Sequence, residues 1–339
     1  MTQENKLKMW GWSISNFRKF FPKPFGQLYL DGANTFYIPE DWMKKDPKLA
    51  IIILNWNNAT ATIHCLSLIS RWSTVQTEVI VVDNGSFVED ISKIQQAGQP
   101  YRFICNQRNL GYAGGNNVGI TFALNEGFPF IMLLNSDAII SEQCVIKLLE
   151  CLEHGPDMGV VGPLLEEQGI VYSGGRNIGI YSNTRIRQSP QKRNGKLVPV
   201  NYVPGTVFIA KGEIFKTVGL LEEEYFFSGE VADFCQRVHK AGFTCNVFSG
   251  CRATHLPDPD SGVRESLYNY YILRNRFLFI RRNFPYLKYF LYFRWIAGGT
   301  LQVLLAFLTG RRERARATWF GLNDGMSGKF GGLNDLFLR

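Results

Sequence analysis

Residues 78–86 read EVIVVDNGS, a run of mostly β-branched residues that ends in a carboxylate and a turn. Residues 49–58 (LAIIILNWNN) and 130–137 (FIMLLNSD) repeat the pattern. A short apolar run bounded by polar residues is typical of a parallel strand buried on both faces. Because ligands bind beyond the carboxyl ends of such strands, the polar residues after each run are the first candidates for a functional site.

Strands and helices continue to alternate on both sides of these runs. The sequence predicts further strands at 101–105, 159–162, 207–210 and 245–248. It predicts helices at 59–71, 116–126, 144–154 and 213–218, and another that begins near Glu230. This alternation predicts an α/β fold with a doubly wound, mostly parallel sheet. The polar stretch 171–203 predicts an irregular lobe or a hairpin.

Length and composition place the chain among globular proteins. It has 339 residues, of which 45% are hydrophobic and 19% are charged. These values exclude a disordered chain, a collagen, a coiled coil, a disulfide miniprotein and a polytopic membrane protein. Seven cysteines without a CxxC spacing indicate reduced thiols, and the first residues lack the pattern of a signal peptide. We therefore expect a cytoplasmic protein.

The net charge of +8 is unevenly distributed and divides the chain into three regions. Residues 1–48 hold eight basic and five acidic residues, and residues 264–339 hold thirteen basic and four acidic residues. The middle region, 49–263, therefore has a net charge of −4, which fits a site for a metal or a metal-bound phosphate. We expect an N-terminal appendage at 1–48, a central α/β domain at 49–263 and a basic helical region at 264–339.

Both basic ends are also rich in aromatic residues, which suits the headgroup level of an anionic membrane. Near the N-terminus, a short amphipathic helix around Trp10 and Trp12 would lie either on a membrane or on the body of the protein. Nine arginines from Arg274 to Arg316 are interleaved with aromatic residues, and a soluble helical bundle is the alternative reading. The most apolar run, Ile296–Thr309, is about 14 residues long, shorter than the roughly 20 that span a bilayer. No nucleic-acid-binding module is present in the sequence.

Four side chains in the central region could carry chemistry. Asp83 follows a strand and could accept the imide N–H of uracil or thymine, or it could cap a turn. Asp137 ends another strand, where a carboxylate can hold Mg²⁺ or Mn²⁺ together with substrate phosphates. A second ligand is then needed, and His255 after the strand at 245–248 is a candidate. Glu230 follows a run of aromatic residues at a predicted helix start, a favourable position for a general base.

The stretch 109–119, NLGYAGGNNVG, is rich in glycine and asparagine and precedes a predicted helix. Glycine lets the backbone approach a ligand closely, and a helix N-terminus attracts phosphate. A plain turn is the alternative. The spacing matches neither a dinucleotide fingerprint nor a P-loop.

Seven segments, taken in order, resemble the inverting family 2 glycosyltransferases with the GT-A fold, and in particular bacterial rhamnosyltransferase-like members. The segments are IIILNWN, VIVVDNGS, NLGYAGGNNVGI, IMLLNSD, VPGTVFIAKGEIF, GLLEEEYFFSGEVADFCQRVHKAGF and RATH. They cover about Leu49 to His255. The resemblance implies a transferase that uses a nucleotide-sugar donor and one Mg²⁺ or Mn²⁺ ion.

The resemblance also implies roles for individual residues. Asp83 would bind the pyrimidine base, and Asp137 stands for the last acid of the family's DXD motif, whose first acid is Asn135 here. Asp137 and His255 would contact the metal. The implied donor-binding residues are Asn55, Trp56, Asp83, Gly115, Asn117 and Asn135.

One departure affects the catalytic base. Many relatives read Glu-Asp-Val-Asp where this chain has Glu230-Val231-Ala232-Asp233. The acid usually assigned as base is the second of the four, which is Val231 here. Glu230 is then the candidate base, and a catalytically degenerate protein that binds a nucleotide-sugar or a glycan is the alternative.

The function implied is transfer of rhamnose or a hexose from a dTDP- or UDP-sugar to a glycan or lipid-linked glycan, in cell-envelope polysaccharide synthesis. An enzyme of this kind is expected to be peripheral at the inner face of the cell membrane. A nucleotidyltransferase would need a glycine-rich, basic loop after the first strand, and an NAD-dependent oxidoreductase would need a dinucleotide fingerprint there. The sequence leaves the sugar, the linkage and the oligomeric state open, a homo-oligomer included.

Overall fold

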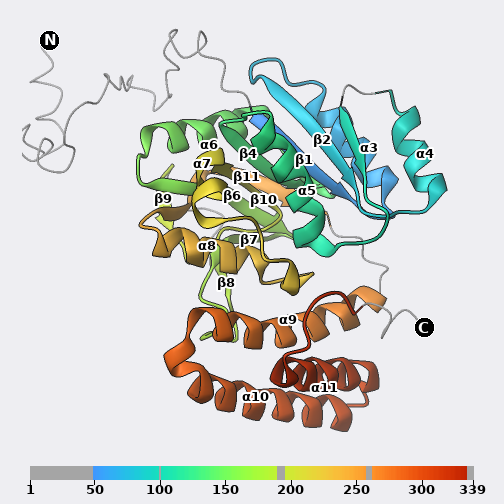
Figure 1. The fold of residues 1–339 in the computed structure, drawn as a ribbon, viewed down its shortest axis with the longest axis vertical. Coiled ribbons are helices and arrows are strands. Elements are labelled where there is room, and N and C mark those ends of the chain that lie inside the picture. The colour runs from blue at the N-terminus through green and yellow to red at the C-terminus, as the bar shows by residue number, and fades with distance from the viewer. Residues whose placement is uncertain (1–48, 99–100, 189–194, 257–261, 334–339) are drawn as a thin grey trace, which may run out of the picture. The chain divides into compact units, whose positions relative to one another are not determined.

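A computed structural model of the chain describes residues 49–98, 101–188, 195–256 and 262–333 (Figure 1). The predicted N-terminal appendage at 1–48, with its amphipathic helix, lies outside these residues.

One large mixed sheet forms the centre of the described structure. Its main path runs β3-β2-β1-β4-β10-β6-β11-β5. The pairings give β3, β2, β1, β4, β6 and β11 a common direction, while β10 and β5 run antiparallel to them. The mostly parallel sheet predicted from the sequence is therefore confirmed. The strands on this path are β1 (Leu49–Asn55), β2 (Thr77–Asp83), β3 (Arg102–Cys105), β4 (Phe130–Asn135), β5 (Ala138–Ile140), β6 (Met158–Glu167), β10 (Val207–Lys211) and β11 (Thr244–His255).

Helices cover both faces of this sheet, as a doubly wound fold requires. Every residue of β1 except Leu54 is buried, so apolar side chains from both faces need cover. Helices α5, α7 and α8 share one apolar cluster with β1, β2, β4 and β10. Helices α3 and α6 contact the sheet with buried residues outside that cluster. The bounds are α3 (Ala59–Ile69), α4 (Val88–Gln96), α5 (Gly111–Asn125), α6 (Glu142–His154), α7 (Gly212–Val218) and α8 (Glu230–Lys240).

Helix α5 differs from the sequence prediction. It begins at Gly111, whereas the sequence predicted a glycine-rich turn and a helix from 116. The glycines serve close packing against the sheet. A Cβ on Gly115 would lie 2.4 Å from Leu54 Cδ1, and one on Gly119 would lie 2.6 Å from Ile52 Cγ2. The glycine-rich stretch is therefore part of a helix that approaches β1 closely.

In its described residues, the polar stretch 171–203 contains a hairpin and one further strand. Strand β7 (Ile170–Gly175) pairs antiparallel with β6 and with β8 (Arg185–Gln188). Strand β9 (Leu197–Pro199) pairs with β11. The expectation of a lobe or hairpin after β6 is met by the β7–β8 hairpin, which extends the sheet beside the end of β6.

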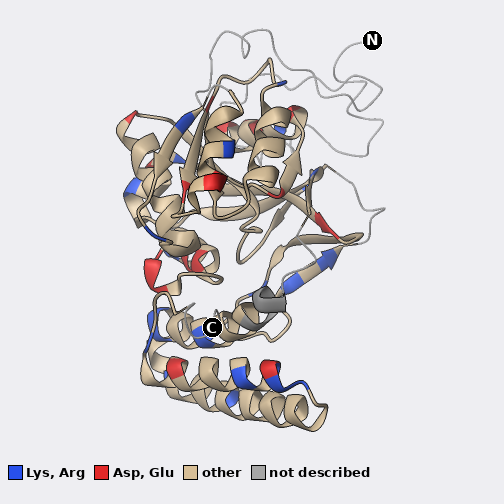
Figure 2. Cartoon of the chain, turned by 90° about the vertical axis from the view of Figure 1, so that its right-hand side faces the viewer, with Lys and Arg blue, Asp and Glu red and all other residues tan. Residues whose placement is uncertain are grey.

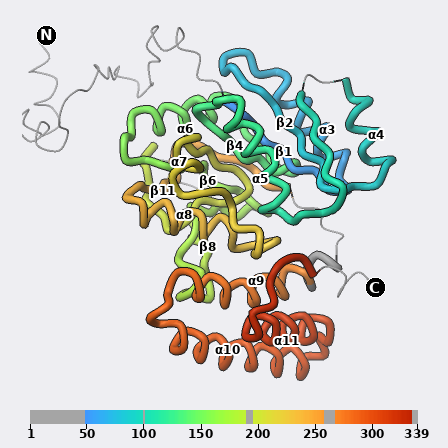
Figure 3. Tube along the Cα trace, viewed as in Figure 1, coloured from blue at the N-terminus to red at the C-terminus, as the bar shows by residue number. Residues whose placement is uncertain are grey.

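The C-terminal region is helical, as the sequence predicted. Helices α9 (Gly262–Asn283), α10 (Lys288–Leu308) and α11 (Arg312–Ser327) contact one another (Figure 3), with the short 3₁₀ turn η2 (Pro285–Leu287) between α9 and α10. Their shared core includes Leu273, Phe277, Trp295 and Leu322.

Helix α9 is also joined to the sheet domain through buried arginines. Arg276 donates to the carbonyl oxygens of Ile178, at 2.9 Å, and Tyr181, at 2.7 Å. Arg274 donates to the carbonyl oxygen of Tyr225 at 2.9 Å. Both side chains are buried, so these two of the nine arginines do not lie at a membrane headgroup level.

The apolar helix in this region is longer than the sequence predicted. Among the residues described, Pro285–Leu308 form one stretch of 24 residues that is long and apolar enough to cross a membrane by length and composition, with a mean hydropathy of 1.4 over an 18-residue window. The sequence analysis ended the apolar run at Arg294, but one arginine does not interrupt a helix. The Arg294 guanidinium donates to the carbonyl oxygen of Ile180 on the protein body.

Candidate functional site

The candidate site is built around the end of β11, where two neighbouring strands place acidic residues on either side of His255. β11 pairs with β6 so that His255 is opposite Glu167, and it pairs with β5 so that His255 is opposite Ala138. Asp137 directly precedes β5, and its carbonyl accepts the N–H of Leu256 at 2.8 Å. The sheet order β6-β11-β5 therefore brings Asp137, His255 and Glu167 together.

Hydrogen bonding and charge join these three side chains. His255 Nδ1 lies 2.7 Å from Glu167 Oε1, and His255 Nε2 lies 3.2 Å from Asp137 Oδ2. Burial of the imidazole opposes its charge, but the neighbouring carboxylates of Asp137 and Glu167 outweigh burial and raise the pKa of His255 to about 9. The hydrogen bond from His255 lowers the pKa of Glu167 to about 2, with a further contribution from Arg185. The sequence predicted the proximity of Asp137 and His255, and the structure contains it.

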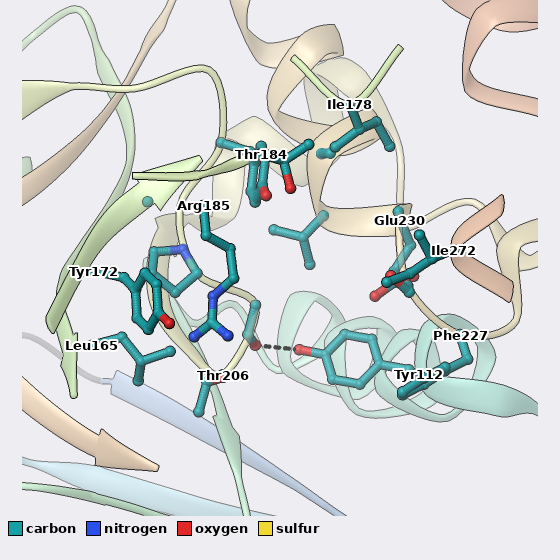
Figure 4. A pocket seen from close by; sticks show the side chains of 18 of the residues that line it. Tyr112, Leu165, Tyr172, Ile178, Thr184, Arg185, Thr206, Phe227, Glu230 and Ile272 are labelled. Atoms are coloured by element: carbon teal, nitrogen blue, oxygen red, sulfur yellow. Dashed lines mark hydrogen bonds between the residues drawn. The ribbon is translucent and has the colours of Figure 1, made fainter. Parts of the chain in front are cut away.

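A cavity of about 760 Å³ opens beside this cluster. Arg185 and Tyr172 lie on one side of it, and Glu230, Phe227 and Ile272 lie on the other (Figure 4). Its lining also includes Asn135, Glu167 and His255, so the cavity reaches both the strand ends and the start of α8. The volume is in the usual range for small-molecule sites.

Glu230 has the properties of a general base. It is the first residue of α8 and is 6% exposed. Among the described residues, its Oε2 atom has no hydrogen-bond partner. Burial raises the pKa of Glu230 to about 7, close to the value at which a base is most effective at neutral pH. The negative charge of Glu230 also contributes, after burial, to a raised pKa of Tyr112, whose hydroxyl donates to the Gly205 carbonyl at 2.6 Å.

The segment before Glu230 is strained and held by α9. Phe226 has φ 61° and ψ −54°, and Phe227 N–H donates to the Tyr225 carbonyl at 2.7 Å, which makes a rare type of γ-turn. Asn275 Nδ2 lies within hydrogen-bond distance of the carbonyls of Tyr225, Phe227 and Ser228. Strained turns of this kind persist where the surroundings enforce them and are common at functional sites. The C-terminal helical region thus supports the orientation of Glu230.

The neighbours of Glu230 on α8 have different environments. Val231 lines the cavity at the position where many relatives carry an acid. Asp233 is fully buried and receives hydrogen bonds from Arg237 Nε at 3.0 Å and Asn283 Nδ2 at 2.9 Å. Asp233 therefore serves a structural role, and Glu230 is the acid of this segment that reaches the cavity.

The residues expected to bind the base of the donor form a separate buried network at the ends of β1 and β2. Asn55 Nδ2 donates to Asp83 Oδ1 at 2.8 Å, and Thr62 donates to Asn55 Oδ1 at 2.8 Å. The other oxygen of Asp83 accepts the backbone N–H of Ser86 at 3.0 Å. Asp83 and Asn55 are both 0% exposed, and they are not part of the lining of the cavity.

Of the remaining donor-binding candidates, one lines the cavity and the others do not. Trp56 is 40% exposed next to this network, and Asn135 lines the cavity at the end of β4. Gly115 packs against Leu54. Asn117 exchanges hydrogen bonds of 2.9 and 3.0 Å with the backbone of Leu221. Asn135, Glu230 and His255 therefore line one cavity, and Asp137 lies beside His255, while the other candidates are not part of the lining.

A divalent cation fits the Asp137–His255 pair when substrate oxygens complete its shell. The described residues contain no group of three or more His, Cys, Asp or Glu side chains arranged to hold a metal. However, His255 Nε2 is buried, and within the described part of the chain no contact to it has hydrogen-bond geometry. A ring nitrogen in this state, beside a carboxylate oxygen, is a suitable donor pair for Mn²⁺ or Mg²⁺. Such a site depends on phosphate oxygens for most of its ligands.

Sequence reasoning missed three features of the site. Glu167 and Arg185 line the cavity, and they form an ion pair of 2.5 Å. Asn275 of α9 both lines the cavity and supports the turn before Glu230. Glu167 ends an apolar strand, as Asp83 does, and this is the signal that could have identified it. No local signal marks Arg185 or Asn275, because tertiary packing brings them to the site.

The chain matches the model of glycosyl transferase family 2 over residues 50–217. It is 29% identical, over 68% of this chain and 74% of the relative, to the low-salt glycan biosynthesis hexosyltransferase Agl10 of Haloferax volcanii. It is 25% identical, over 64% of this chain and 75% of the relative, to the dTDP-rhamnosyl transferase RfbF of Shigella flexneri.

Among solved structures, the chain is similar to a mannosyltransferase from Pyrobaculum calidifontis in complex with GDP-Man and Mn²⁺. The TM-score is 0.57 at 12% identity, over 85% of this chain and 89% of that one. This likeness and the sheet topology show the GT-A fold. Together with the family match and the two curated relatives, they establish that the chain belongs to glycosyl transferase family 2.

Proposed function

We propose that the chain is an inverting, metal-dependent transferase that moves rhamnose or a hexose from a dTDP- or UDP-sugar to a glycan or lipid-linked glycan acceptor. The observation that carries this proposal is the carboxylate of Glu230. It is buried and has an oxygen without a partner in the described structure, and it lines the same cavity as His255. The dTDP-rhamnosyl and glycan-biosynthesis relatives support the donor and acceptor classes.

The proposed reaction is a single displacement. Glu230 takes the proton of an acceptor hydroxyl while that oxygen forms a bond to the anomeric carbon. The bond from the anomeric carbon to the diphosphate oxygen breaks, the nucleoside diphosphate leaves with the electron pair, and the configuration inverts. Asp137 and His255 would hold a divalent cation, and that ion would stabilise the negative charge of the leaving diphosphate.

The surroundings of Glu230 suit a sugar acceptor. Phe227, Ile272 and Ile178 provide an apolar surface beside the carboxylate (Figure 4). A sugar ring presents apolar C–H groups on its faces and hydroxyls at its edge. The apolar surface would orient the ring, and Glu230 would receive one of its hydroxyl protons.

Binding of nucleoside diphosphates tests this proposal directly. UDP, dTDP, GDP and NAD are added in turn to the protein, with and without Mn²⁺, and binding is measured by calorimetry. We expect UDP or dTDP to bind in a Mn²⁺-dependent way, because the two protein ligands need phosphate oxygens to complete the cation's shell. Absence of binding by both pyrimidine nucleotides would contradict the proposal and would leave a protein that shares the family fold and binds another ligand.

A second part of the proposal concerns location: the enzyme is cytoplasmic and associates peripherally with the inner face of an anionic membrane. Helix α10 carries most of the exposed large apolar side chains of the helical region, and its charged residues are Lys288 and Arg294. Figure 2 shows the charged residues of the chain. The exposed residues are Tyr289, Phe290, Phe293, Leu301, Leu304, Leu305, Phe307 and Leu308. The neighbouring segment 311–316 adds four arginines, which suit anionic headgroups.

Vesicle flotation tests this location with matched phenylalanines. Phe293 and Phe307 on α10 are 73% and 66% exposed, and Phe87, which precedes α4, is 70% exposed. On anionic vesicles, the Phe293→Asp/Phe307→Asp variant is expected to bind at least about tenfold more weakly than the wild type, since each buried phenylalanine contributes about 2 kcal/mol. Phe87→Asp should bind like the wild type. Equal flotation of all three proteins would contradict a docking role for α10.

A further inference from the structure

A shift in register between β11 and β6 determines which residue lies opposite Glu167. β11 and β6 pair in parallel, but the register shifts between Phe248 and Arg252, so that Phe248 is opposite Pro163 and Arg252 is opposite Leu164. Three extra residues of β11 are accommodated in this bulge. If the register continued unshifted from Phe248, Arg252 would lie opposite Glu167 and His255 would lie beyond the end of β6. The bulge is the reason that His255 and Glu167 are neighbours, and bulges next to active sites commonly re-aim a side chain in this way.

The contacts of Glu167 orient the imidazole of His255. Glu167 Oε1 lies 2.7 Å from Nδ1 of the ring. Glu167 Oε2 is 2.5 Å from Arg185, and the Arg185 guanidinium lies 3.6 Å above the centroid of the Tyr172 ring. The carboxylate is therefore fixed from both of its oxygens. A ring whose Nδ1 donates to such a carboxylate presents Nε2 on its other side, and the lone pair of Nε2 can bind a cation once the cation has displaced the proton there.

We propose that Glu167 is the positioning residue for His255: it holds Nδ1–H so that Nε2 faces the cation that binds with the donor diphosphate. This inference rests on the proposed function, because it assigns the cation to the Asp137–His255 pair. Glu167 does not touch the cation or the substrate in this arrangement. Arg185 contributes by holding the second oxygen of Glu167.

The adjacent residue on β6 provides a matched control. Glu166 also carries a carboxylate in an ion pair of 2.5 Å, but its partner is Arg252. Side chains alternate along a strand, so Glu166 points to the other face of the sheet, and it is absent from the lining of the cavity. Replacing Glu166 therefore removes one strand-end charge and one ion pair without touching His255.

The test is the affinity for Mn²⁺, measured by electron paramagnetic resonance in the presence of the nucleoside diphosphate that the wild type binds. Glu167→Ala is expected to weaken Mn²⁺ binding by about 10–100-fold, the usual effect of losing a partner of a metal-ligating histidine. Glu167→Gln should recover most of this loss, because its amide oxygen can still accept Nδ1–H. Glu166→Ala should bind Mn²⁺ like the wild type.

A double-mutant comparison separates positioning from general damage to the fold. If Glu167 acts through His255, adding Glu167→Ala to His255→Ala should cause no further loss of Mn²⁺ affinity. Wild-type affinity in Glu167→Ala, or a full additional loss in the double variant, would overturn the inference. Failure of the proposed function would appear differently, as a wild-type protein that does not bind Mn²⁺ with any pyrimidine nucleotide.

Discussion

The variant Glu230→Gln is expected to lose turnover by about 10²–10⁴-fold, the range that general base catalysis supplies. The amide has nearly the shape of the carboxylate, so it fits the first turn of α8, but it cannot take a proton from the acceptor. Binding of the nucleoside diphosphate should be unchanged, because Glu230 lies across the cavity from Arg185 and the strand-end cluster (Figure 4). Single-turnover transfer and calorimetry on the same preparation measure the two effects separately.

The pH dependence of the wild type follows from the same residue. Burial raises the pKa of Glu230 to about 7, and the reaction needs the carboxylate form. The rate should therefore fall about tenfold for each pH unit below 7 and level off above it. Glu230→Gln should have lost this acidic limb, and a residual activity that keeps it would assign the base to another group.

As pH rises toward 7, the free energy of unfolding should fall while the rate of turnover rises. The folded-state pKa of about 7 exceeds the ordinary value of 4.5, so the folded state binds the extra proton between these pH values. The wild type therefore becomes less stable as pH rises from 4.5 to 7, by up to roughly 3 kcal/mol. Glu230→Gln removes that cost, so its unfolding free energy should exceed that of the wild type at pH 8 and match it at pH 4.

Glu213→Gln is the matched control for this comparison. Glu213 occupies the first turn of α7 as Glu230 occupies that of α8, so both substitutions remove a carboxyl group from the first turn of a helix. The Glu213 side chain is 66% exposed. Its replacement should leave turnover and the pH profile unchanged. Full turnover in Glu230→Gln would reject Glu230 as the base.

The fold was predictable because the strands carry their signal locally. LAIIIL and EVIVV can be buried only between helical layers, and β1 and β2 form at these runs. The glycine-rich stretch misled, since glycine favours a turn in isolation. Its glycines instead allow α5 to contact β1 closely. The helix forms here because of this packing against the sheet, which the local sequence does not reveal.

The sequence predicted the acidic residues of the site at the ends of strands, but it did not predict the residues and contacts around them. Asp137 and His255 each end or follow a strand, and the sheet order brings them together. The β11 bulge, which aligns His255 with Glu167, depends on hydrogen bonding between strands that are far apart in sequence. Asp83 has the same strand-end pattern as Asp137 but bonds to Asn55 and to the turn at Ser86. A carboxylate at the end of a strand can therefore either belong to a site or form structural hydrogen bonds, and the sequence alone does not distinguish the two cases.

The variant Asp137→Ala should abolish the Mn²⁺-dependent part of nucleotide binding. Only Asp137 and His255 are proposed to supply protein ligands to the cation, so losing the carboxylate removes half of the protein's contribution and its negative charge. The loss should exceed the roughly 100-fold that follows from changing an indirect partner of a ligand. Affinity for UDP or dTDP without Mn²⁺ should stay near that of the wild type, because nucleotide binding without Mn²⁺ does not depend on a ligand of the cation.

Asp157→Ala is the control for Asp137→Ala, since Asp157 is an exposed aspartate that precedes β6. It should bind UDP or dTDP with Mn²⁺ as the wild type does. His255→Ala should reproduce the loss seen in Asp137→Ala, and the double variant should lose little more, since two ligands of one cation do not contribute independently. Mn²⁺-dependent binding that survives in Asp137→Ala would place the cation elsewhere. In that case the 3.2 Å contact between Asp137 and His255 would be a structural ion pair, and the diphosphate would depend on cationic side chains that line the cavity, such as Arg185.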